Sequence, residues 1–319
     1  MKIFFGILVV ILVIFGVWRI LLGPSQLKSQ PEIFSVPQLR GDFDISDQLK
    51  EQKLISSAWG FRILLNLLAH GKEIQSGGYR LNKNFNAWQV LKKITGKPDL
   101  LWVTIYGCRR KEEIGETLAA TLGWSEEELK LWDTVYTNSK PEYFEGVYYP
   151  DTYLIPIDES GEQVAQRLIA RFNEKFAPLA DRFVAKNIKW TTGLKIASLI
   201  AREAAGPQDM KLISGIIWNR LDQGIKLEID ATMQYTSGQA GSWWRSIDLA
   251  EKRKDSPYNT YLYKGLPPTP ICSPGIDTIE AVLKPEETEC LFYLHDRNRE
   301  IHCAKTYPEH QANIRRYWL

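Results

Sequence analysis

The sequence has few residues of the types that bind metals or form disulfides. It contains only four cysteines and four histidines in 319 residues. The cysteines lack the C-x-x-C spacing and the histidines lack the H-x-x-x-H spacing that are common in metal sites. We therefore predict neither a metal site nor a cofactor. Cys290 and Cys303 flank a predicted hairpin and could approach each other, but spacing alone does not establish a disulfide between them.

The chain also lacks an excess of charge of either sign. Forty Lys and Arg residues stand against 38 Asp and Glu residues, so the composition does not point to a nucleic-acid partner. Aromatic residues, in contrast, are abundant, with 11 Trp and 14 Tyr. Most are expected to pack in cores, and some could form flat platforms for sugar rings. The length allows an anchor and two domains, each with its own core.

One long hydrophobic run occurs at the N-terminus. The first 22 residues are apolar apart from Lys2 and Arg19, and about 20 apolar residues are enough to cross a bilayer. A cleaved signal peptide is the alternative, but no small-x-small cleavage site follows the run. We therefore predict a retained transmembrane anchor at 1–23 and a polar linker at 24–32. Lys2 weakly favours a cytoplasmic N-terminus, so the rest of the chain would face the outside.

Beyond the linker, the hydrophobic patterns predict an α+β protein. Segments 33–36 and 101–105 each read as a strand followed by a helix with an i, i+4 apolar pair, and this similarity is either a repeat or a coincidence. A hairpin is predicted around the turn at 296–299. The other predicted elements are strands at 76–81 and 146–155, helices at 88–94, 163–176, 194–205 and 209–221, and an irregular, exposed segment at 237–256 that contains Trp243 and Trp244.

Glu203 is the strongest candidate for a catalytic residue. Ile196, Leu199 and Ile200 precede it by seven, four and three residues, so its carboxylate lies on the apolar face of a predicted helix. Burial raises the pKa of a carboxyl group, which suits a general acid that works near neutral pH. The alternative is a structural ion pair with a nearby cation, for which Arg220 is available.

Rigid polar loops follow the helix that carries Glu203. Four prolines occur within residues 267–274, and such loops fix hydrogen-bonding groups in advance, which suits a polyol ligand. Asn259 and Tyr261, beside this loop, are candidates to bind a sugar. The alternative is that Asn259 only stabilises its own turn. Asp230 begins an Asp-x-Thr turn and is interpreted as a binding or loop-fixing residue or, equally well, as a capping residue.

In their order and spacing these motifs resemble those of the endolytic murein transglycosylases, the MltG or YceG-like family. The resemblance covers nearly the whole chain. Each motif alone is weak, but together they are specific. The matching segments are the N-terminal anchor, Gly78–Arg80, Glu145–Gly146, Pro150–Tyr153, Ala197–Glu203, Asn219–Leu221, Asp230 with Thr232 and Tyr235, Tyr258–Tyr261, Gly265–Pro268, Pro274–Gly275 and Lys305–His310.

The resemblance implies a fold and an activity. The fold would be a membrane-proximal LysM-like strand–helix module at 33–100 and a lysozyme-like helical catalytic core with an added β-hairpin at 101–319. The activity would be that of a lytic transglycosylase, a lyase that cuts the β-1,4 bond from N-acetylmuramic acid to N-acetylglucosamine in nascent peptidoglycan and so terminates glycan elongation. Glu203 aligns with the catalytic glutamate of the family. The substrate-binding residues would be Asp230, Tyr235, Asn259, Thr260 and Tyr261.

The resemblance also implies a location and partners. The chain would cross the bacterial cytoplasmic (inner) membrane once, with its catalytic domain on the extracytoplasmic side. Its partners would be nascent glycan strands, membrane lipid and the peptidoglycan synthases of the elongation or division machinery.

A single carboxylate is enough for this reaction. Glu203 would protonate the glycosidic oxygen and then take the proton of the muramic C6 hydroxyl, which attacks C1 and forms a 1,6-anhydro ring. An ordinary glycosidase needs a second carboxylate, but here the attacking hydroxyl is already held near the reacting carbon.

The sequence departs from the family pattern at three positions. Ala201 replaces the usual Glu, and Glu228 and Ala231 stand where Gln and Pro are usual. Glu228 could repel a charged ligand or raise the pKa of Glu203 if the two are close. Two other functions stay open: a non-catalytic glycan-binding or divisome scaffold, and a true peptidoglycan glycosidase that uses Asp230 or Glu228 as its second group.

Overall fold

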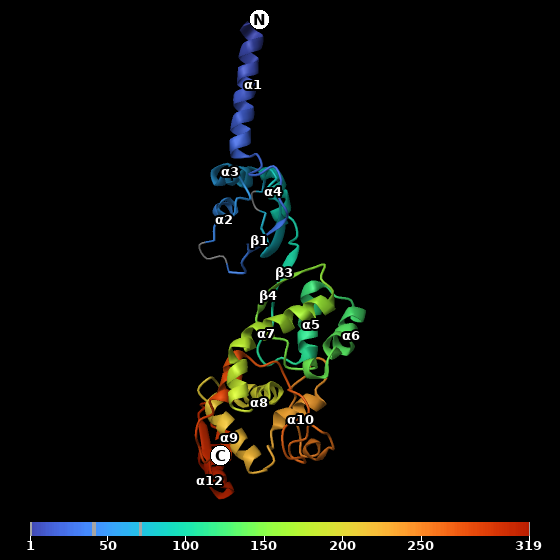
Figure 1. Cartoon of the computed structure of the whole chain (residues 1–319), viewed down its shortest axis with the longest axis vertical. Coiled ribbons are helices and arrows are strands. Elements are labelled where there is room, and N and C mark those ends of the chain that lie inside the picture. The colour runs from blue at the N-terminus through green and yellow to red at the C-terminus, as the bar shows by residue number, and fades with distance from the viewer. Residues whose placement is uncertain (1, 40–42, 70–71, 319) are drawn as a thin grey trace. The chain divides into compact units, whose positions relative to one another are not determined.

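The computed structural model describes residues 2–39, 43–69 and 72–318 (Figure 1). The chain divides into two compact units. The first contains residues 1–103 and 152–159, and the second contains residues 104–151 and 160–319. The predicted α+β class with an N-terminal apolar helix is confirmed.

The first unit begins with a helix that could cross a membrane. Helix α1 spans Lys2–Leu21, and its Phe4–Leu21 window is apolar with none of its residues buried inside the protein. Its length and composition are those of a transmembrane helix. The helix agrees with the predicted single-pass anchor.

A curled four-stranded sheet forms the rest of the first unit, together with three helices. The strands, in sheet order, are β1 (Glu32–Val36), β2 (Gly77–Leu81), β3 (Leu100–Thr104) and β4 (Thr152–Pro156), and the helices are α2 (Ile45–Glu51), α3 (Ala58–Leu68) and α4 (Ala87–Ile94). Strands β1 and β2 are antiparallel, with Glu32 opposite Leu81. Side chains alternate between the two faces along β1, so Phe34 and Val36 both point into a core that also contains Phe61 of α3.

The predicted strand at 146–155 is wrong in its first half. Only residues from Thr152 onward join the sheet as β4. Gly146 has φ +88°, a left-handed backbone conformation that interrupts an extended strand, and Pro150 cannot donate a ladder hydrogen bond. The tyrosines at 148 and 149 are buried in the second unit instead.

The second unit is mainly helical. Its helices are α5 (Lys111–Leu122), α6 (Glu126–Thr134), η1 (Tyr136–Asn138), η2 (Pro141–Tyr143), α7 (Gly161–Ala185), α8 (Trp190–Glu203), α9 (Met210–Asp222), α10 (Asp230–Ser237), η3 (Glu251–Arg253), α11 (Ile276–Leu283) and α12 (Tyr307–Tyr317), and its hairpin pairs β5 (Phe292–His295) with β6 (Ile301–Ala304). Helix α8 packs against α9 and α11. Its residues Ile196, Leu199 and Ile200 are fully buried, so the predicted apolar face exists and ends at Glu203.

The two segments that resemble each other in sequence do not form equivalent structures. Strands β1 and β3 lie in the same sheet, but helix α2 belongs to the first unit and helix α5 to the second. The elements are confirmed, whereas the interpretation as a structural repeat is not supported.

Two disulfides close loops in the second unit. Cys290 and Cys303 are paired across the hairpin with their Cα atoms 5.8 Å apart, the pairing that spacing alone left open. Cys108 and Cys272 are also paired, with their Cα atoms 4.8 Å apart and a separation of 164 residues. This second bridge joins the segment before α5 to the proline-rich loop.

Candidate active site

A cleft of about 570 Å³ lies at the C-terminal end of α8. Its wall contains Glu203, two carboxylates, two cations and several aromatic rings. The lining residues are Glu203, Arg220, Leu227, Glu228, Ile229, Asp230, Lys252, Tyr261, Phe292, Tyr293, Tyr307 and His310. The cleft therefore combines an acid, polar groups and flat apolar surfaces, which is the usual chemistry of a small-ligand site.

Glu203 is the last residue of α8, and its carboxyl group is held by Tyr293 of β5. The Tyr293 hydroxyl donates a hydrogen bond of 2.6 Å to Glu203 Oε2. Burial raises the pKa of Glu203, and the negative charge of Asp230 adds to the rise; the bond from Tyr293 and the nearby His295 and Arg202 oppose it only in part. Glu203 therefore keeps its proton to a higher pH than a free glutamic acid.

Arg220 does not pair with Glu203. Its guanidinium donates to the backbone carbonyls of Lys226 (2.8 Å) and Leu291 (2.6 Å) and lies 3.2 Å from Glu228 Oε2. Among the described residues, no ion pair joins Glu203 to a cation. The alternative interpretation of Glu203 as half of a structural ion pair with Arg220 is therefore not supported.

Asp230 and Tyr261 meet in the cleft, together with Lys252. The Tyr261 hydroxyl donates a hydrogen bond to Asp230 Oδ1. Lys252 Nζ lies 2.8 Å from the same oxygen and donates to the Tyr261 hydroxyl at 3.0 Å. Asp230 is the first residue of α10, a helix where the sequence predicted a turn, and the N-cap position is occupied by Ile229 instead. Its position favours the binding interpretation over the capping one.

Asn259 and Thr260 lie behind the cleft wall. Asn259 is fully buried; it donates to the carbonyls of Lys252 (3.1 Å) and Lys254 (2.8 Å) and accepts from the amide of Tyr261 (2.9 Å). The Thr260 hydroxyl accepts a 3.0 Å bond from the amide of Ile229. Their substrate-binding role stays a prediction. Their positions favour the alternative, in which they hold Tyr261 and Lys252 in place.

Tyr235 is buried at a different place, against Glu145. Its hydroxyl donates to Glu145 Oε2 at 3.3 Å, and the Arg110 guanidinium lies 4.3 Å from the centre of its ring. Glu145 is 1% exposed and also accepts from the amides of Lys111 (3.1 Å) and Gly146 (3.0 Å). Burial raises the pKa of Glu145 to about 8. Tyr235 is thus not among the residues that line the cleft, and its predicted contact with substrate has no support from its position.

Among the cleft residues to which the sequence analysis assigned no role, Tyr293, Lys252 and His310 carry polar or titratable groups. Tyr293 belongs to the predicted hairpin, but the sequence does not show that its hydroxyl group bonds to Glu203. Lys252 lies in a segment that was interpreted as irregular. His310 stacks on Phe292 with ring centres 5.5 Å apart, and burial lowers its pKa. Their grouping depends on the packing of the hairpin and α12 beside α8, which local patterns do not encode.

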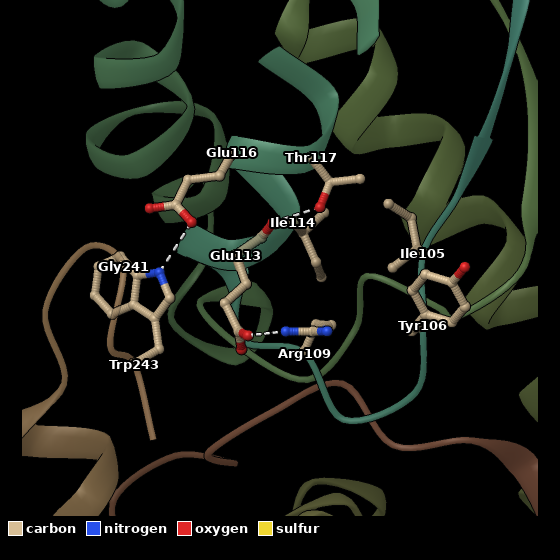
Figure 2. Close-up of a pocket in the computed structure, with 9 residues that line it drawn as sticks. All are labelled: Ile105, Tyr106, Arg109, Glu113, Ile114, Glu116, Thr117, Gly241 and Trp243. Carbon is tan, nitrogen blue, oxygen red and sulfur yellow. Dashed lines mark hydrogen bonds and ion pairs between the residues drawn. The ribbon is translucent and has the colours of Figure 1, made fainter. Parts of the chain in front are cut away.

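A second cavity, also of about 570 Å³, lies between α5 and the segment around Trp243 (Figure 2). Figure 2 shows the Arg109–Glu113 ion pair among the lining residues and the indole of Trp243 donating to Glu116 Oε2, a bond of 3.0 Å. The next residue, Trp244, donates to Glu113 Oε2 at 2.7 Å. The prediction that these two tryptophans are exposed is wrong, because hydrogen bonds hold both half-buried rings against α5.

Trp244, next to the cavity residue Trp243, contacts the helix that carries Glu203. The guanidinium of Arg202, the residue before Glu203, lies 3.9 Å from the centre of the Trp244 ring. Its Nε is buried and has no hydrogen-bond partner among the described residues. Burial lowers the pKa of Arg202, and the negative charge of Glu113 offsets part of this lowering. Trp244 and Arg202 therefore link α5 to the end of α8.

One cluster has the composition of a metal site. Potential ligand atoms of Asp296, Glu300 and His302 lie within 4.8 Å of one another. The Asp296 carboxylate, however, accepts from the amides of Asn298 (2.8 Å) and Glu300 (2.9 Å) and lies 3.0 Å from His302 Nε2. These bonds account for the cluster as the turn of the β5–β6 hairpin.

A carboxylic acid that lines an open cleft and has a pKa raised by burial has the arrangement of a general-acid catalyst, and the α+β fold around it is found in known proteins. The YceG-like family model matches residues 34–316, and the chain belongs to this family. The family membership predicted from the sequence is confirmed.

Two bacterial relatives support this membership. The chain is 26% identical over 320 residues to the endolytic murein transglycosylase of Bacillus subtilis strain 168, which covers 93% of this chain and 88% of that protein. It is 25% identical over 280 residues to the protein of the same name from Streptococcus pneumoniae strain D39, which covers 76% of this chain and 50% of that protein. The chain thus spans about half the length of the pneumococcal relative.

A solved structure has the same fold. The crystal structure of a yceG-like protein from Listeria monocytogenes superposes with a TM-score of 0.61 at 25% sequence identity, covering 89% of this chain and 99% of that chain.

Proposed function

We propose that this protein is a lytic transglycosylase that cuts peptidoglycan glycan strands internally and leaves 1,6-anhydro-N-acetylmuramic acid ends. One observation carries the proposal: burial raises the pKa of Glu203, which lines a cleft and accepts a hydrogen bond from Tyr293, while no described cation forms an ion pair with it. The names of the bacterial relatives support the same reaction.

Glu203 serves as acid and then as base. Its proton passes to the glycosidic oxygen as the bond from that oxygen to C1 of N-acetylmuramic acid breaks, and the N-acetylglucosamine end leaves with a free hydroxyl. The resulting carboxylate takes the proton of the C6 hydroxyl, whose oxygen attacks C1 and closes the anhydro ring. Tyr293 holds Oε2, which leaves Oε1 for the sugar. No water is consumed, and Glu203 ends the cycle protonated.

Asp230, Tyr261 and Lys252 hold the glycan beside Glu203. Burial and the charge of Asp230 raise the pKa of Tyr261, so its hydroxyl stays a donor. Lys252 adds a positive charge to the same wall. A fixed set of a donor, an acceptor and a cation can orient the hydroxyl and acetamido groups of an amino sugar.

The anchor and the disulfides fit a location outside the cytoplasm. We infer that α1 is retained in the bacterial cytoplasmic membrane, that the second unit is a lysozyme-like catalytic domain on the extracytoplasmic side, and that the first unit is a LysM-like module. Disulfides persist in such oxidising compartments, and the second unit contains two. This location places the cleft near nascent strands and their synthases.

Analysis of the products tests the reaction. Purified sacculi are digested with the full chain in detergent, and the new glycan ends are identified by mass spectrometry. Anhydro-muramic ends that are absent with the Glu203→Gln variant are the expected result. A folded wild-type protein that produces no new ends would overturn the proposal and leave a glycan-binding scaffold.

A true glycosidase is the second candidate, because Asp230 lies in the same cleft as Glu203. Retaining and inverting glycosidases both use two carboxyl groups around the scissile bond. In this cleft Asp230 is already engaged by Lys252 and Tyr261, which favours a binding role. Reducing ends in place of anhydro ends would establish the glycosidase.

A further inference from the structure

Helix α3 (Ala58–Leu68) is apolar on opposite faces. One face packs into the core of the first unit, where Phe61 is fully buried. The other face carries Trp59, Ile63 and Leu67, which are 62%, 40% and 74% exposed. These residues follow an i, i+4, i+8 spacing and form one continuous stripe. We call them the α3 stripe. A helix that is apolar on both faces normally has both covered, and no part of the described chain covers this stripe.

The α3 stripe begins where the transmembrane helix ends. Figure 1 shows α3 lying across the end of α1, and the two helices are in contact. Gly60 allows this approach, because a Cβ atom there would lie 2.9 Å from the carbonyl oxygen of Leu21. Trp59 and Ile63 flank this contact in the sequence. The stripe is therefore close to the level at which the span leaves the hydrocarbon.

Hydrogen bonds fix the end of α1 to the body of the first unit. The amide of Ala87 donates to the Leu22 carbonyl at 2.8 Å, and the amide of Gln26 donates to the Lys83 carbonyl at 3.0 Å. The Ser56 hydroxyl donates to the Gly23 carbonyl at 2.7 Å. The start of the predicted linker at 24–32 is thus tied down, and α3 cannot swing freely away from the span.

Tryptophan side chains gather at the same level. Trp18, in the last turn of α1, is 41% exposed, and Trp88, beside the bonded Ala87, is 53% exposed. Tryptophan is enriched where membrane meets water, because its ring is apolar and its N–H is polar. Trp18 and Trp88 therefore add exposed aromatic rings on α1 and α4, which are joined by the bond from Ala87 to Leu22.

We propose that α3 is a second membrane contact, a helix that lies in the bilayer interface with the α3 stripe turned into the lipid. Continuity with the span identifies lipid as the occupant of this face. Short helices with one apolar face bind membranes in this way, and an exposed apolar patch at the foot of a span would otherwise face water. The contact holds the first unit flat against the membrane, and it stands independently of the reaction in the cleft.

A labelled full-length chain tests the proposal. All four native cysteines are in disulfides, so one added cysteine carries a fluorescent probe that senses polarity. The probe is placed by Leu67→Cys, and the matched control by Leu39→Cys, another exposed leucine of the first unit beyond the end of β1 (74% and 91% exposed). Both proteins are reconstituted in vesicles of phosphatidylethanolamine and phosphatidylglycerol, with and without lipids that carry a quencher in their acyl chains.

The expected result is strong quenching of the Leu67→Cys probe by the lipid-borne quencher and weak quenching by iodide in the water, with the reverse for Leu39→Cys. Equal iodide quenching at both positions would show that the stripe faces water and would overturn the proposal. Protection from both quenchers would also overturn it, because protein and not lipid would then cover the stripe.

A double variant provides a second measurement. Trp59→Ser with Leu67→Ser removes most of the α3 stripe without touching the core, so the chain should still fold and insert through α1. A probe at Ile63→Cys should then lose at least half of its lipid-borne quenching relative to the same probe in the parent chain. Unchanged quenching would show that the stripe does not hold α3 in the interface.

Discussion

Two glutamates of the second unit, Glu203 and Glu145, have pKa values raised by burial, but their surroundings differ. Glu203 ends a helix at a cleft and accepts one hydrogen bond from a tyrosine. Glu145 is enclosed and accepts bonds from two backbone amides and from Tyr235. A raised pKa alone therefore does not identify a catalytic acid. Access to a ligand separates the two.

Replacing Glu203 tests the comparison most strongly. Glu203→Gln keeps the size and the hydrogen bond but can neither give nor take a proton. General acid–base catalysis contributes ~10²–10⁴ to a rate, and Glu203 serves both steps, so turnover should fall by about this factor or more. The rate of release of anhydro-muramic ends measures it, and Glu145→Gln is the matched control. A folded Glu203→Gln protein with more than about a tenth of wild-type turnover would contradict the assignment.

Replacing Glu145 should change stability instead of chemistry. The folded pKa is about 8 against an ordinary 4.5, so between these pH values the folded protein binds a proton that the unfolded chain has lost. The free energy of unfolding should therefore fall as pH rises through this window, by up to about 1.4 kcal/mol per pH unit from this group.

The Glu145→Gln variant should lack this part of the pH dependence. Denaturant melts at several pH values between 5 and 9 compare it with the parent chain, and turnover of the variant should stay within about threefold. Identical pH profiles of stability in the two proteins would show that Glu145 is not a buried neutral acid.

Asn259 distinguishes a residue that binds sugar from one that holds a loop. It is fully buried, and its three hydrogen bonds all go to backbone groups. Asn259→Ala should lower the free energy of unfolding by about 1–3 kcal/mol, because buried backbone partners lose their bonds. Activity per folded molecule should change little. A large loss of activity with an unchanged melting temperature would instead favour the sugar-binding role.

Replacing Tyr293 tests whether its hydrogen bond sets the pKa of Glu203. Its hydrogen bond lowers the pKa of Glu203 in part, so Tyr293→Phe should raise this pKa and move the alkaline fall of activity to higher pH. Loss of a hydrogen bond to the catalytic group should lower the maximum turnover about tenfold. A pH–rate profile measures both. A shift of the alkaline limb to lower pH would show that Tyr293 does not favour the charged form of Glu203.

Much of the fold follows from local patterns in the sequence. The span, the strands at β1, β2 and β3, the hairpin and the helix that ends at Glu203 all have clear hydrophobic periodicity. Helix α3 was not predicted, because apolar residues on two faces hide the period of an amphipathic helix. The start of α10 was predicted as a turn, because Asp and Thr favour both turns and first helical turns.

The candidate site was predicted only in part, for a physical reason. Glu203, Asp230 and Tyr261 do lie in one cleft. Asn259 and Thr260 have side chains of the type that hydrogen-bond to sugars. A polar residue looks the same in sequence, however, whether it faces a ligand or a buried backbone group. Tyr293 comes from a hairpin 90 residues after Glu203, and contacts at this separation depend on tertiary packing.

The bridge between Cys108 and Cys272 also constrains when the protein matures. Synthesis from the N-terminus produces Cys108 long before Cys272, which follows 164 residues later. Glu203 and the start of α10 lie inside this covalent ring. The ring can close only after nearly the whole chain has been synthesised and an oxidant is present. Completion of the bridge is thus a late step in folding, and until then helix α8, which ends at Glu203, lies in a ring that is still open.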